Sequence, residues 1–374
     1  MTDRCLVGAD RKENSVKAKA LLPVLGLCVT ALIAQPALAS PGPDMSGGAD
    51  DGVALRAESS GKIAKGDTAF VNVTSATVWT SPDSPRSVDS PATQAPVDLD
   101  AWNEALSSTE TRRGLTGLVQ TQAPYGAELT VLEVQGKWAK VAVADQSSPK
   151  EDRGYPGWVP KKQIVENDRF VEFREDQPTA VVTARTADLE GVQYADLPGD
   201  ETPEATINVE LPLLSQDVDD VRVALPGGGA AWIDYDDVRI DDPEHDFTVP
   251  EPSRSDIVET AEQFEGLRYL WGGVSPYGFD CSGFTYTVFR AHGIDIARDA
   301  GDQQKQGKAV KQSDLEKGDL LFFASGGSGR AHHVGVYVGD GKMIHAPNAS
   351  KSVEVVDWKS WDSGGQYVES RRVL

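Results

Sequence analysis

One stretch constrains this chain more than any other, because it joins an aromatic segment and a glycine-rich loop to a cysteine that opens a helix. Residues 269–284 read YLWGGVSPYGFDCSGF, and Val288 and Phe289 continue an apolar stripe at helical spacing until Gly293. Cys281 would therefore lie in the first turn of a helix, among unpaired backbone N–H groups and at the positive end of the helix dipole. This position predicts a lowered thiol pKa and a nucleophilic thiolate.

The first 39 residues have the layout of a secretory signal peptide. Basic residues up to Lys19 precede an apolar run over residues 20–34, and Ala37-Leu-Ala39 offers a cleavage site. A retained membrane anchor is the alternative, but the run is shorter than the roughly 20 residues that a span needs. We expect cleavage after Ala39, a secreted or cell-envelope location and no stable membrane insertion afterwards. Cys281 would then be the sole cysteine, a lone thiol that an oxidising compartment disfavours unless it has a use.

The length and the charge limit the domain count and the partners. A chain of 374 residues predicts two or three domains. Its 58 acidic and 36 basic residues give a formal net charge of −22, which disfavours a nucleic-acid partner.

Residue patterns divide the rest of the chain. Residues 40–66 are poor in large apolar residues and predict a disordered leader. Short β runs separated by Gly and Pro over 67–166, with a helix-bearing insertion, and again over 170–242, predict two small all-β barrels. One larger all-β domain is the alternative. An acidic, proline-bearing linker at 243–254 leads to an α+β domain over 255–374, with helices first and antiparallel strands after.

A thiol nucleophile needs a base within hydrogen-bond reach and a third group that orients the base. His333 opens a predicted strand and shares one face of it with Gly335, while His345 lies on the next strand beyond the hairpin at residues 339–341. Neighbouring strands can bring the two imidazoles side by side. We therefore predict that Cys281 attacks, His333 takes its proton and His345 fixes the tautomer of His333. The other histidines, His245, His292 and His332, are interpreted as structural or solvent-facing.

A zinc site is the competing use of one cysteine and two histidines. The sequence has no Cys-x-x-Cys or His-Glu-x-x-His pattern near these residues. We expect no metal and no cofactor.

These residues occur in motifs that resemble the NlpC-type, papain-like cysteine peptidases of bacterial cell walls. The resemblance spans about residues 255–374. The motifs that carry it are Tyr269-Leu-Trp-Gly-Gly, Phe279-Asp-Cys-Ser-Gly-Phe, Ile296-Ala-Arg-Asp, Gly318-Asp-Leu-Leu-Phe-Phe, His333-Val-Gly-Val-Tyr and Ile344-His-Ala. The two predicted barrels resemble the bacterial SH3-like domains of the γ-D-glutamyl-L-diamino acid endopeptidase branch, a likeness supported by Gly154-Tyr-Pro-Gly-Trp-Val.

The resemblance implies a papain-like fold and hydrolysis of the bond between γ-D-glutamate and L-Lys or meso-diaminopimelate in peptidoglycan stem peptides. The partners would be muropeptides, especially those with a free N-terminal L-Ala. It implies that Asp280 binds the substrate's amine, Ser282 lines the pocket and Tyr269 donates to the oxyanion. Arg298 could pair with a substrate carboxylate, and Tyr155 would reach over the cleft and exclude longer substrates.

Some details depart from the pattern or stay open. Ala300 and Ala127 stand where the resemblance leads us to expect a serine and an acid, and Glu128 is a further candidate for reading the amine. Taken alone, Asp280 could be a helix cap. Other functions on this scaffold are an N-acetylmuramoyl-L-alanine amidase, an acyltransferase, or a wall-binding protein with an inert C-terminal domain.

Overall fold

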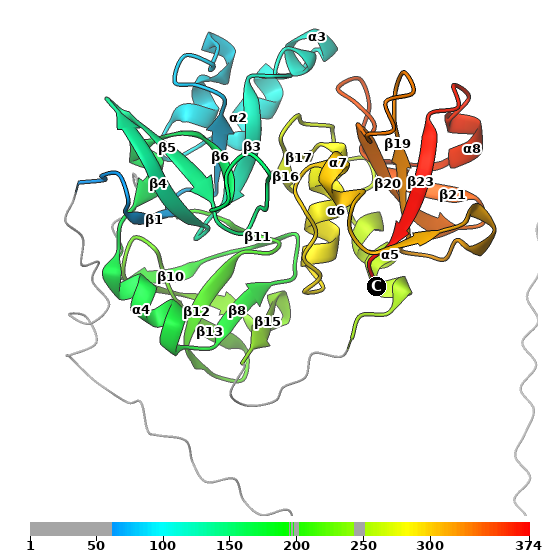
Figure 1. Ribbon diagram of the computed structural model, residues 1–374. Helices are drawn as coiled ribbons and strands as arrows, with labels where there is room; N and C mark the ends of the chain where they lie inside the picture. The colour runs from blue at the N-terminus through cyan, green and yellow to red at the C-terminus, as the bar shows by residue number, and fades with distance from the viewer. Residues whose placement is uncertain (1–61, 194, 196, 198–201, 243–250) are drawn as a thin grey trace, which may run out of the picture. The chain divides into compact units, whose positions relative to one another are not determined.

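The computed structural model describes residues 62–193, 195, 197, 202–242 and 251–374 (Figure 1). The predicted signal peptide, residues 40–61 of the predicted leader and residues 243–250 of the predicted linker lie outside the described residues. None of the helices in the described part of the chain combines the length and the apolar character that a membrane span requires.

The first sheet has seven antiparallel strands in the order β3-β2-β6-β5-β4-β1-β7. Its inward side chains are Ala, Val and Leu on alternate positions, and they form one buried cluster. Gly136, with a φ of 57°, lets the chain turn tightly between β4 and β5. The strands are β1 (Thr68–Val71), β2 (Ser75–Trp79), β3 (Val119–Pro124), β4 (Glu128–Gln135), β5 (Trp138–Val143), β6 (Tyr155–Pro160) and β7 (Ile164–Val165), with the short 3₁₀ helix η2 (Lys161–Gln163) between β6 and β7.

The insertion between β2 and β3, predicted to bear a helix, carries a 3₁₀ helix and two short α-helices. Asp98 caps the first helix, and Ser108 caps the second by accepting the N–H of Thr111. The polar pair Ser107-Ser108 therefore ends one helix and starts another, because such side chains compete for backbone hydrogen bonds. The elements are η1 (Ser87–Thr93), α2 (Leu99–Ala105) and α3 (Thr109–Arg113).

A separate second sheet follows, with six antiparallel strands in the order β10-β14-β13-β12-β8-β15. The structure thus has two sheets over the region where one larger β domain was the alternative. Helix α4 (Asp168–Asp176) precedes this sheet and buries Phe170 in its core. The elements are β8 (Thr179–Val182), β10 (Glu190–Gln193), β12 (Glu210–Gln216), β13 (Asp220–Ala224), β14 (Ala230–Asp234) and β15 (Val238–Asp241), together with η3 (Tyr235–Asp237) and the separate pair β9 (Thr186–Ala187) and β11 (Ala205–Thr206).

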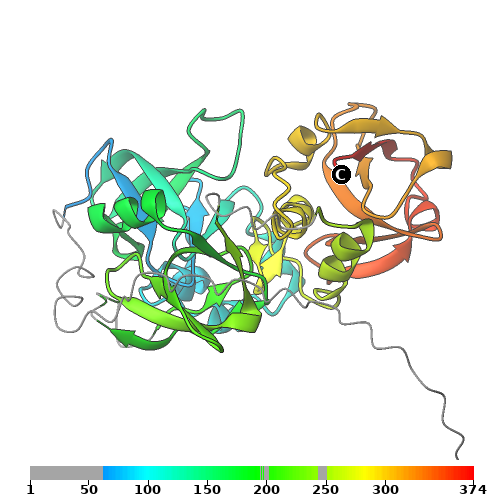
Figure 2. The ribbon, with the colours of Figure 1, turned by 90° about the horizontal axis from the view of Figure 1, so that it is seen from below.

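The C-terminal region has helices first and antiparallel strands after, as predicted. Helices α5 and α6 pack against β20, and Figures 1 and 2 show both along one side of the C-terminal sheet. The predicted hairpin turn joins β20 to β21, with Asp340 and Gly341 at φ values of 50° and 74°. The helices are α5 (Arg254–Glu262), α6 (Cys281–Arg290), η4 (Gln312–Asp314), α7 (Ala300–Gln303) and α8 (Trp358–Trp361). The sheet is β18-β23-β19-β20-β21-β22, formed by β18 (Lys308–Val310), β19 (Leu320–Phe323), β20 (His333–Gly339), β21 (Lys342–His345), β22 (Glu354–Asp357) and β23 (Tyr367–Arg372), beside the ribbon β16 (Val274–Ser275) and β17 (Gly278–Phe279).

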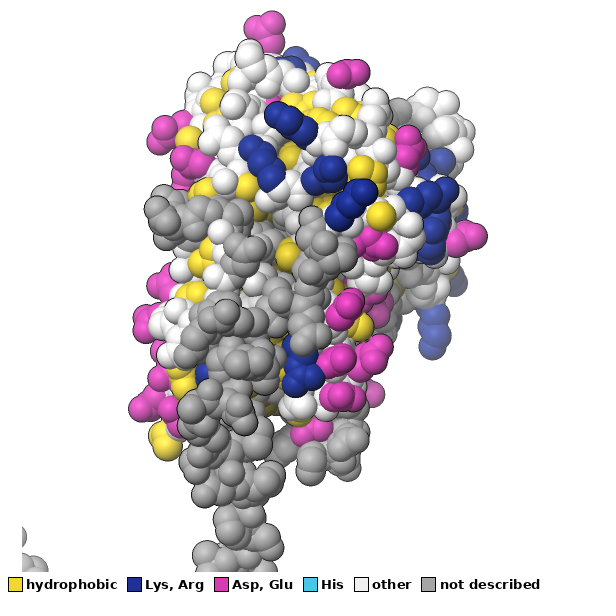
Figure 3. Space-filling model, turned by 90° about the vertical axis from the view of Figure 1, so that its left-hand side faces the viewer, with side chains coloured by type: hydrophobic (Ala, Val, Ile, Leu, Met, Phe, Trp, Pro, Cys, Tyr) yellow, Lys and Arg dark blue, Asp and Glu magenta, His cyan; other side chains and the backbone are white. Residues whose placement is uncertain are grey.

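The net negative charge is not spread evenly over the surface. On the face that Figure 3 shows, Lys and Arg side chains gather in the upper half, while Asp and Glu side chains crowd the lower half.

Candidate active site

Cys281 is the first residue of α6, as the sequence predicted. Asp280 is the N-cap, and its Oδ1 accepts the backbone N–H of Gly283 at 2.7 Å. Gly283 is required here, because a Cβ would come within 2.0 Å of the carbonyl oxygen of Gly273. The helix start is therefore held tightly against the glycine-rich loop that precedes it, and the thiol has a fixed position.

The thiol itself is buried in this structure. Cys281 is 8% exposed, and its Sγ donates to the carbonyl oxygen of His332 at 3.8 Å. Burial, and then the charge of Asp280, raise the pKa of Cys281 to about 12 against the lowering effect of nearby backbone N–H groups and Arg298. The predicted lowering of the thiol pKa is therefore wrong for this state, because the cost of removing a thiolate from water exceeds the help of the helix end. The nucleophile needs a base.

The two predicted partners meet as a pair of neutral imidazoles. His333 on β20 and His345 on β21 are both buried, and His333 Nε2 lies 2.8 Å from His345 Nδ1. Burial is the main reason that the pKa of His333 falls well below its usual value and that of His345 falls to about 3. A neutral His333 has a lone pair available for a proton. It directly follows the residue whose carbonyl accepts from the thiol, so the structure brings the three residues into one region.

Trp361 on α8 packs against both imidazole rings. Its ring lies 5.1 Å from that of His333 at 33° and 4.8 Å from that of His345 at 89°. This residue was not predicted, because α8 is a single short turn that carries no motif of its own.

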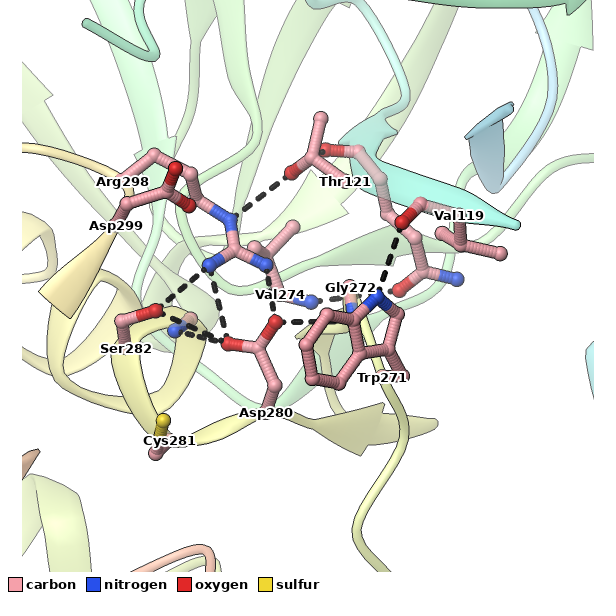
Figure 4. A network of polar contacts seen from close by, with 12 residues as sticks. Val119, Thr121, Trp271, Gly272, Val274, Asp280, Cys281, Ser282, Arg298 and Asp299 are labelled. Carbon is pink, nitrogen blue, oxygen red and sulfur yellow. Dashed lines mark hydrogen bonds and ion pairs between the residues drawn. The ribbon is translucent and has the colours of Figure 1, made fainter. Parts of the chain in front are cut away.

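On the other side of Cys281, the neighbouring side chains form a network around an ion pair (Figure 4). Both Asp280 oxygens accept from Arg298, at 3.0 and 2.8 Å, and Ser282 Oγ accepts from the same guanidinium at 3.1 Å. The Arg298 Nε donates to Thr121 Oγ1 at 2.9 Å, so β3 of the first sheet completes the network. The helix-cap interpretation of Asp280 is confirmed.

Arg298 does not have the open position that a partner of a substrate carboxylate requires. It is 1% exposed, and its donors are directed to Asp280, Ser282 and Thr121. The expected contact with a substrate carboxylate therefore needs correction: in this structure the guanidinium neutralises a buried carboxylate, a task that arginine geometry suits.

Tyr269 and Tyr155 approach this region from two parts of the chain. Tyr269 is 6% exposed, and burial followed by the nearby Cys281 raises the pKa of its hydroxyl, which stays a proton donor. Tyr155 on β6 donates to both Asp299 oxygens, at 3.0 and 2.9 Å, and accepts from Lys150. Asp299 and Lys150 were not predicted. Asp299 follows Arg298 in a motif that the sequence displays, but nothing local shows that Tyr155 would reach it.

Two further expectations concern Glu128 and the remaining histidines. Glu128 is 3.9 Å from Arg174 of α4 and lines a cavity of about 90 Å³ with Arg290, so its placement gives no support for reading the substrate's amine. His292 bonds to Thr260 at 2.8 Å, and His332 contacts Ser325. His245 lies outside the described residues. Within the described ranges no cluster of three or more His, Cys, Asp or Glu side chains could hold a metal ion.

Comparison with known proteins gives two family matches. The NlpC/P60 family matches residues 266–372, which include the helix start and the histidine hairpin. The YKFC SH3b2 domain matches residues 182–240, which is most of the second sheet.

Several relatives are similar over most or part of the chain. A γ-D-glutamyl-L-lysine dipeptidyl-peptidase of Bacillus cereus is 42% identical over 83% of this chain and 92% of its own length. One of Bacillus subtilis is 39% identical over 75% and 90%. A murein DD-endopeptidase/murein LD-carboxypeptidase of Escherichia coli is 38% identical over 32% of this chain and 63% of its own length.

A solved structure agrees with these matches. The crystal structure of an NlpC/P60 family protein from Bacillus cereus superposes with a TM-score of 0.76 at 41% identity, covering 82% of this chain and all of that one. The buried cysteine at a helix start, the paired histidines and the matches over most of the chain together show that this protein belongs to the NlpC/P60 family and carries an SH3b domain ahead of its NlpC/P60 domain.

Proposed function

We propose that this protein is a cysteine endopeptidase that hydrolyses the bond between γ-D-glutamate and the L-diamino acid of peptidoglycan stem peptides. The diamino acid would be L-Lys or meso-diaminopimelate. The observation that carries the proposal is a helix-start cysteine whose thiol contacts the residue directly before His333, which is itself hydrogen-bonded to His345, in a chain 42% identical to a γ-D-glutamyl-L-lysine dipeptidyl-peptidase over nearly the length of that protein.

The reaction follows from the roles of the three residues. His333 takes the proton of Cys281, and the thiolate attacks the carbonyl carbon of γ-D-glutamate. The oxyanion receives hydrogen bonds from N–H groups at the start of α6 and from the Tyr269 hydroxyl. The imidazolium of His333 then gives its proton to the leaving amine, which releases the diamino acid and leaves a thioester on Cys281. His333 next takes a proton from water, and the hydroxide attacks the thioester; the C–S bond breaks, L-Ala-D-Glu leaves, and His333 returns the proton to the Cys281 thiolate.

In this proposal the substrate is recognised by polar side chains near Cys281. Asp280 and Ser282 line the cysteine loop, and Asp299 is held by Tyr155 from β6. In this proposal both carboxylates, which pair with Arg298 and Lys150 in the free protein, contact the primary ammonium of a free N-terminal L-Ala, and this favours such peptides over glycan-linked ones. In this proposal Tyr155 also limits the length of the substrate, and Arg298 keeps Asp280 in place.

The domain plan belongs to the same proposal. The first sheet, within residues 67–166, acts as another SH3-like domain ahead of the one over 170–242, and the catalytic domain spans 255–374. Residues 1–39 direct export to the cell envelope and are removed. Muropeptides are the partners, without nucleic acid and without stable membrane insertion.

Mass spectrometry of digested peptides tests the proposal. The purified protein is incubated with L-Ala-γ-D-Glu-L-Lys, with its N-acetylated form and with intact muropeptides, and Cys281→Ala is the control. Release of L-Ala-D-Glu from the free peptide alone is expected. Release of intact stem peptides from muropeptides would show an N-acetylmuramoyl-L-alanine amidase, transfer to an added amine an acyltransferase, and binding without cleavage an inert C-terminal domain.

A further inference from the structure

One nitrogen of the histidine pair has no hydrogen-bond partner in the described part of the chain. His345 is fully buried, its Nδ1 contacts His333, and its Nε2 is left without a donor or acceptor. Buried polar atoms of this kind are rare and call for a reason. The nearest charged group is the carboxylate of Glu354, whose Oε1 lies 3.9 Å from Nε2.

The sheet fixes this approach. His345 and Glu354 are directly opposite each other in the register of β21 and β22. Opposite residues on neighbouring strands are close enough to interact. A separation of 3.9 Å exceeds a hydrogen bond, so the carboxylate can act on the ring only through its charge, and Lys351, which pairs with it, acts on His345 with the opposite sign.

That charge decides where the protons of the pair lie. Two neutral imidazoles that share one hydrogen bond have two possible arrangements. In the first, His333 Nε2–H donates to His345 Nδ1, and His345 carries its proton on Nε2, facing Glu354. In the second, His345 Nδ1–H donates to His333 Nε2, and the His345 Nε2 lone pair faces the carboxylate. A negative group favours the first arrangement and disfavours the second.

Only the first arrangement leaves His333 a base. With its proton on Nε2, His333 has its lone pair on Nδ1, the nitrogen not used by His345. In the second arrangement Nδ1 carries the proton and cannot accept one from the thiol. We propose that Glu354 is a positioning residue that sets the His333–His345 tautomers so that His333 can deprotonate Cys281. The proposal rests on the roles given above to these three residues.

Lys351 supplies a matched control. Its Nζ lies 3.2 Å from the Glu354 carboxylate, and it is 54% exposed. Removing Lys351 breaks the ion pair but keeps the carboxylate that faces His345. A purely structural ion pair would make both partners equally important, whereas the proposed role needs Glu354 alone. Lys351 and His332 are the other charged or titratable groups that act on the pair, and the positive charge of Lys351 opposes that of Glu354, so its removal does not mimic the loss of the carboxylate.

The test combines imidazole nitrogen NMR of the ¹⁵N-histidine-labelled protein with steady-state kinetics on L-Ala-γ-D-Glu-L-Lys. In the wild type both His333 and His345 should carry the proton on Nε2. Glu354→Met and Glu354→Lys should move both protons to Nδ1 and lower kcat by about tenfold to a hundredfold with little change in KM. Glu354→Gln, which keeps an acceptor, should fall between, and Lys351→Met should keep the wild-type tautomers and kcat.

Unchanged tautomers and kcat in Glu354→Met would overturn the proposal, as would an equal loss in Lys351→Met. If Glu354→Met fails to fold, Glu354→Gln decides, since it retains size and shape. The NMR result does not depend on the substrate, so a wild type that does not cleave the peptide would reject the proposed function without touching the tautomer assignment.

Discussion

Cys281 lies between two groups of side chains that differ in charge and in the part of the chain that supplies them. The histidine side, with His333, His345 and Trp361, is neutral and aromatic and comes wholly from the C-terminal region. The ionic side joins Asp280 and Arg298 to Thr121 of the first sheet. The difference lies in what each side needs: the C-terminal region alone supplies the cysteine and the histidine pair, whereas the ionic network beside the cysteine is completed by a residue of the first sheet.

Replacing the nucleophile should cause the largest loss of activity. We expect Cys281→Ala to lower kcat on L-Ala-γ-D-Glu-L-Lys by about 10⁴-fold or more, because no other group can form the thioester. Peptide binding, measured by calorimetry, should remain, since the ionic side is unchanged. Residual cleavage close to the wild-type rate would place the chemistry elsewhere.

Replacing the base, His333, should cause the second-largest loss of activity. His333→Ala should lower kcat by about 10³-fold with a small change in KM, because proton transfer is lost while the pocket stays intact. Steady-state kinetics with far-UV circular dichroism as a folding check measures this. An equal loss in His332→Ala, the adjacent histidine, would mean that the wrong imidazole has been identified.

On the ionic side, Asp280→Asn should cost stability as well as activity. It leaves the Arg298 charge buried without its partner, a loss of about 3 kcal/mol or more in the free energy of unfolding. The double variant Asp280→Asn/Arg298→Met should recover much of this in chemical denaturation. If the single variant is as stable as the wild type, the ion pair does not hold the cysteine loop.

Lowering the pH should reduce the free energy of unfolding through the buried histidine pair. The folded-state pKa of His345 is about 3, below its ordinary value of 6.5, because of burial. The stability from keeping it neutral is therefore present above pH 6.5 and is lost as the pH falls toward 3, by about 1.4 kcal/mol per pH unit. Denaturation at several pH values should show this slope, and His345→Gln should reduce it. An unchanged slope in that variant would contradict the buried, neutral state.

The contact between domains should show the smallest effect. Thr121→Val removes the acceptor of Arg298 Nε and should cost about 1–3 kcal/mol of stability, with a severalfold rise in KM. Thr77 on the neighbouring strand β2 is equally buried, and its hydroxyl has no hydrogen-bond partner among the described residues. Thr77→Val is therefore the matched control and should be nearly neutral. Equal losses in both variants would remove the special role of the first sheet.

The sequence allowed the histidine side to be predicted because its parts are local. Helical spacing after Cys281 and a glycine turn between two β runs fix a helix start and a hairpin, and these two elements place His333 beside His345. Burial is not local, so the rise of the thiol pKa to about 12 could not be predicted from the residues around Cys281.

The ionic side could be predicted only in part. Arg298 and Thr121 are separated by 177 positions, and Tyr155 and Asp299 by 144. Neither pair leaves a periodic pattern or a local motif. Glu354 is close to His345 along the chain, but its place opposite that residue depends on the register of β21 and β22, which the sequence does not show.

Trapping the thioester tests the central claim most directly. The wild-type protein is mixed with L-Ala-γ-D-Glu-L-Lys, quenched in acid during turnover and mapped by peptide mass spectrometry. The account predicts an L-Ala-D-Glu acyl group on Cys281 and free L-Lys in solution, with no acyl group in Cys281→Ala. An acyl group on another residue, or free L-Lys formed equally well by Cys281→Ala, would contradict it.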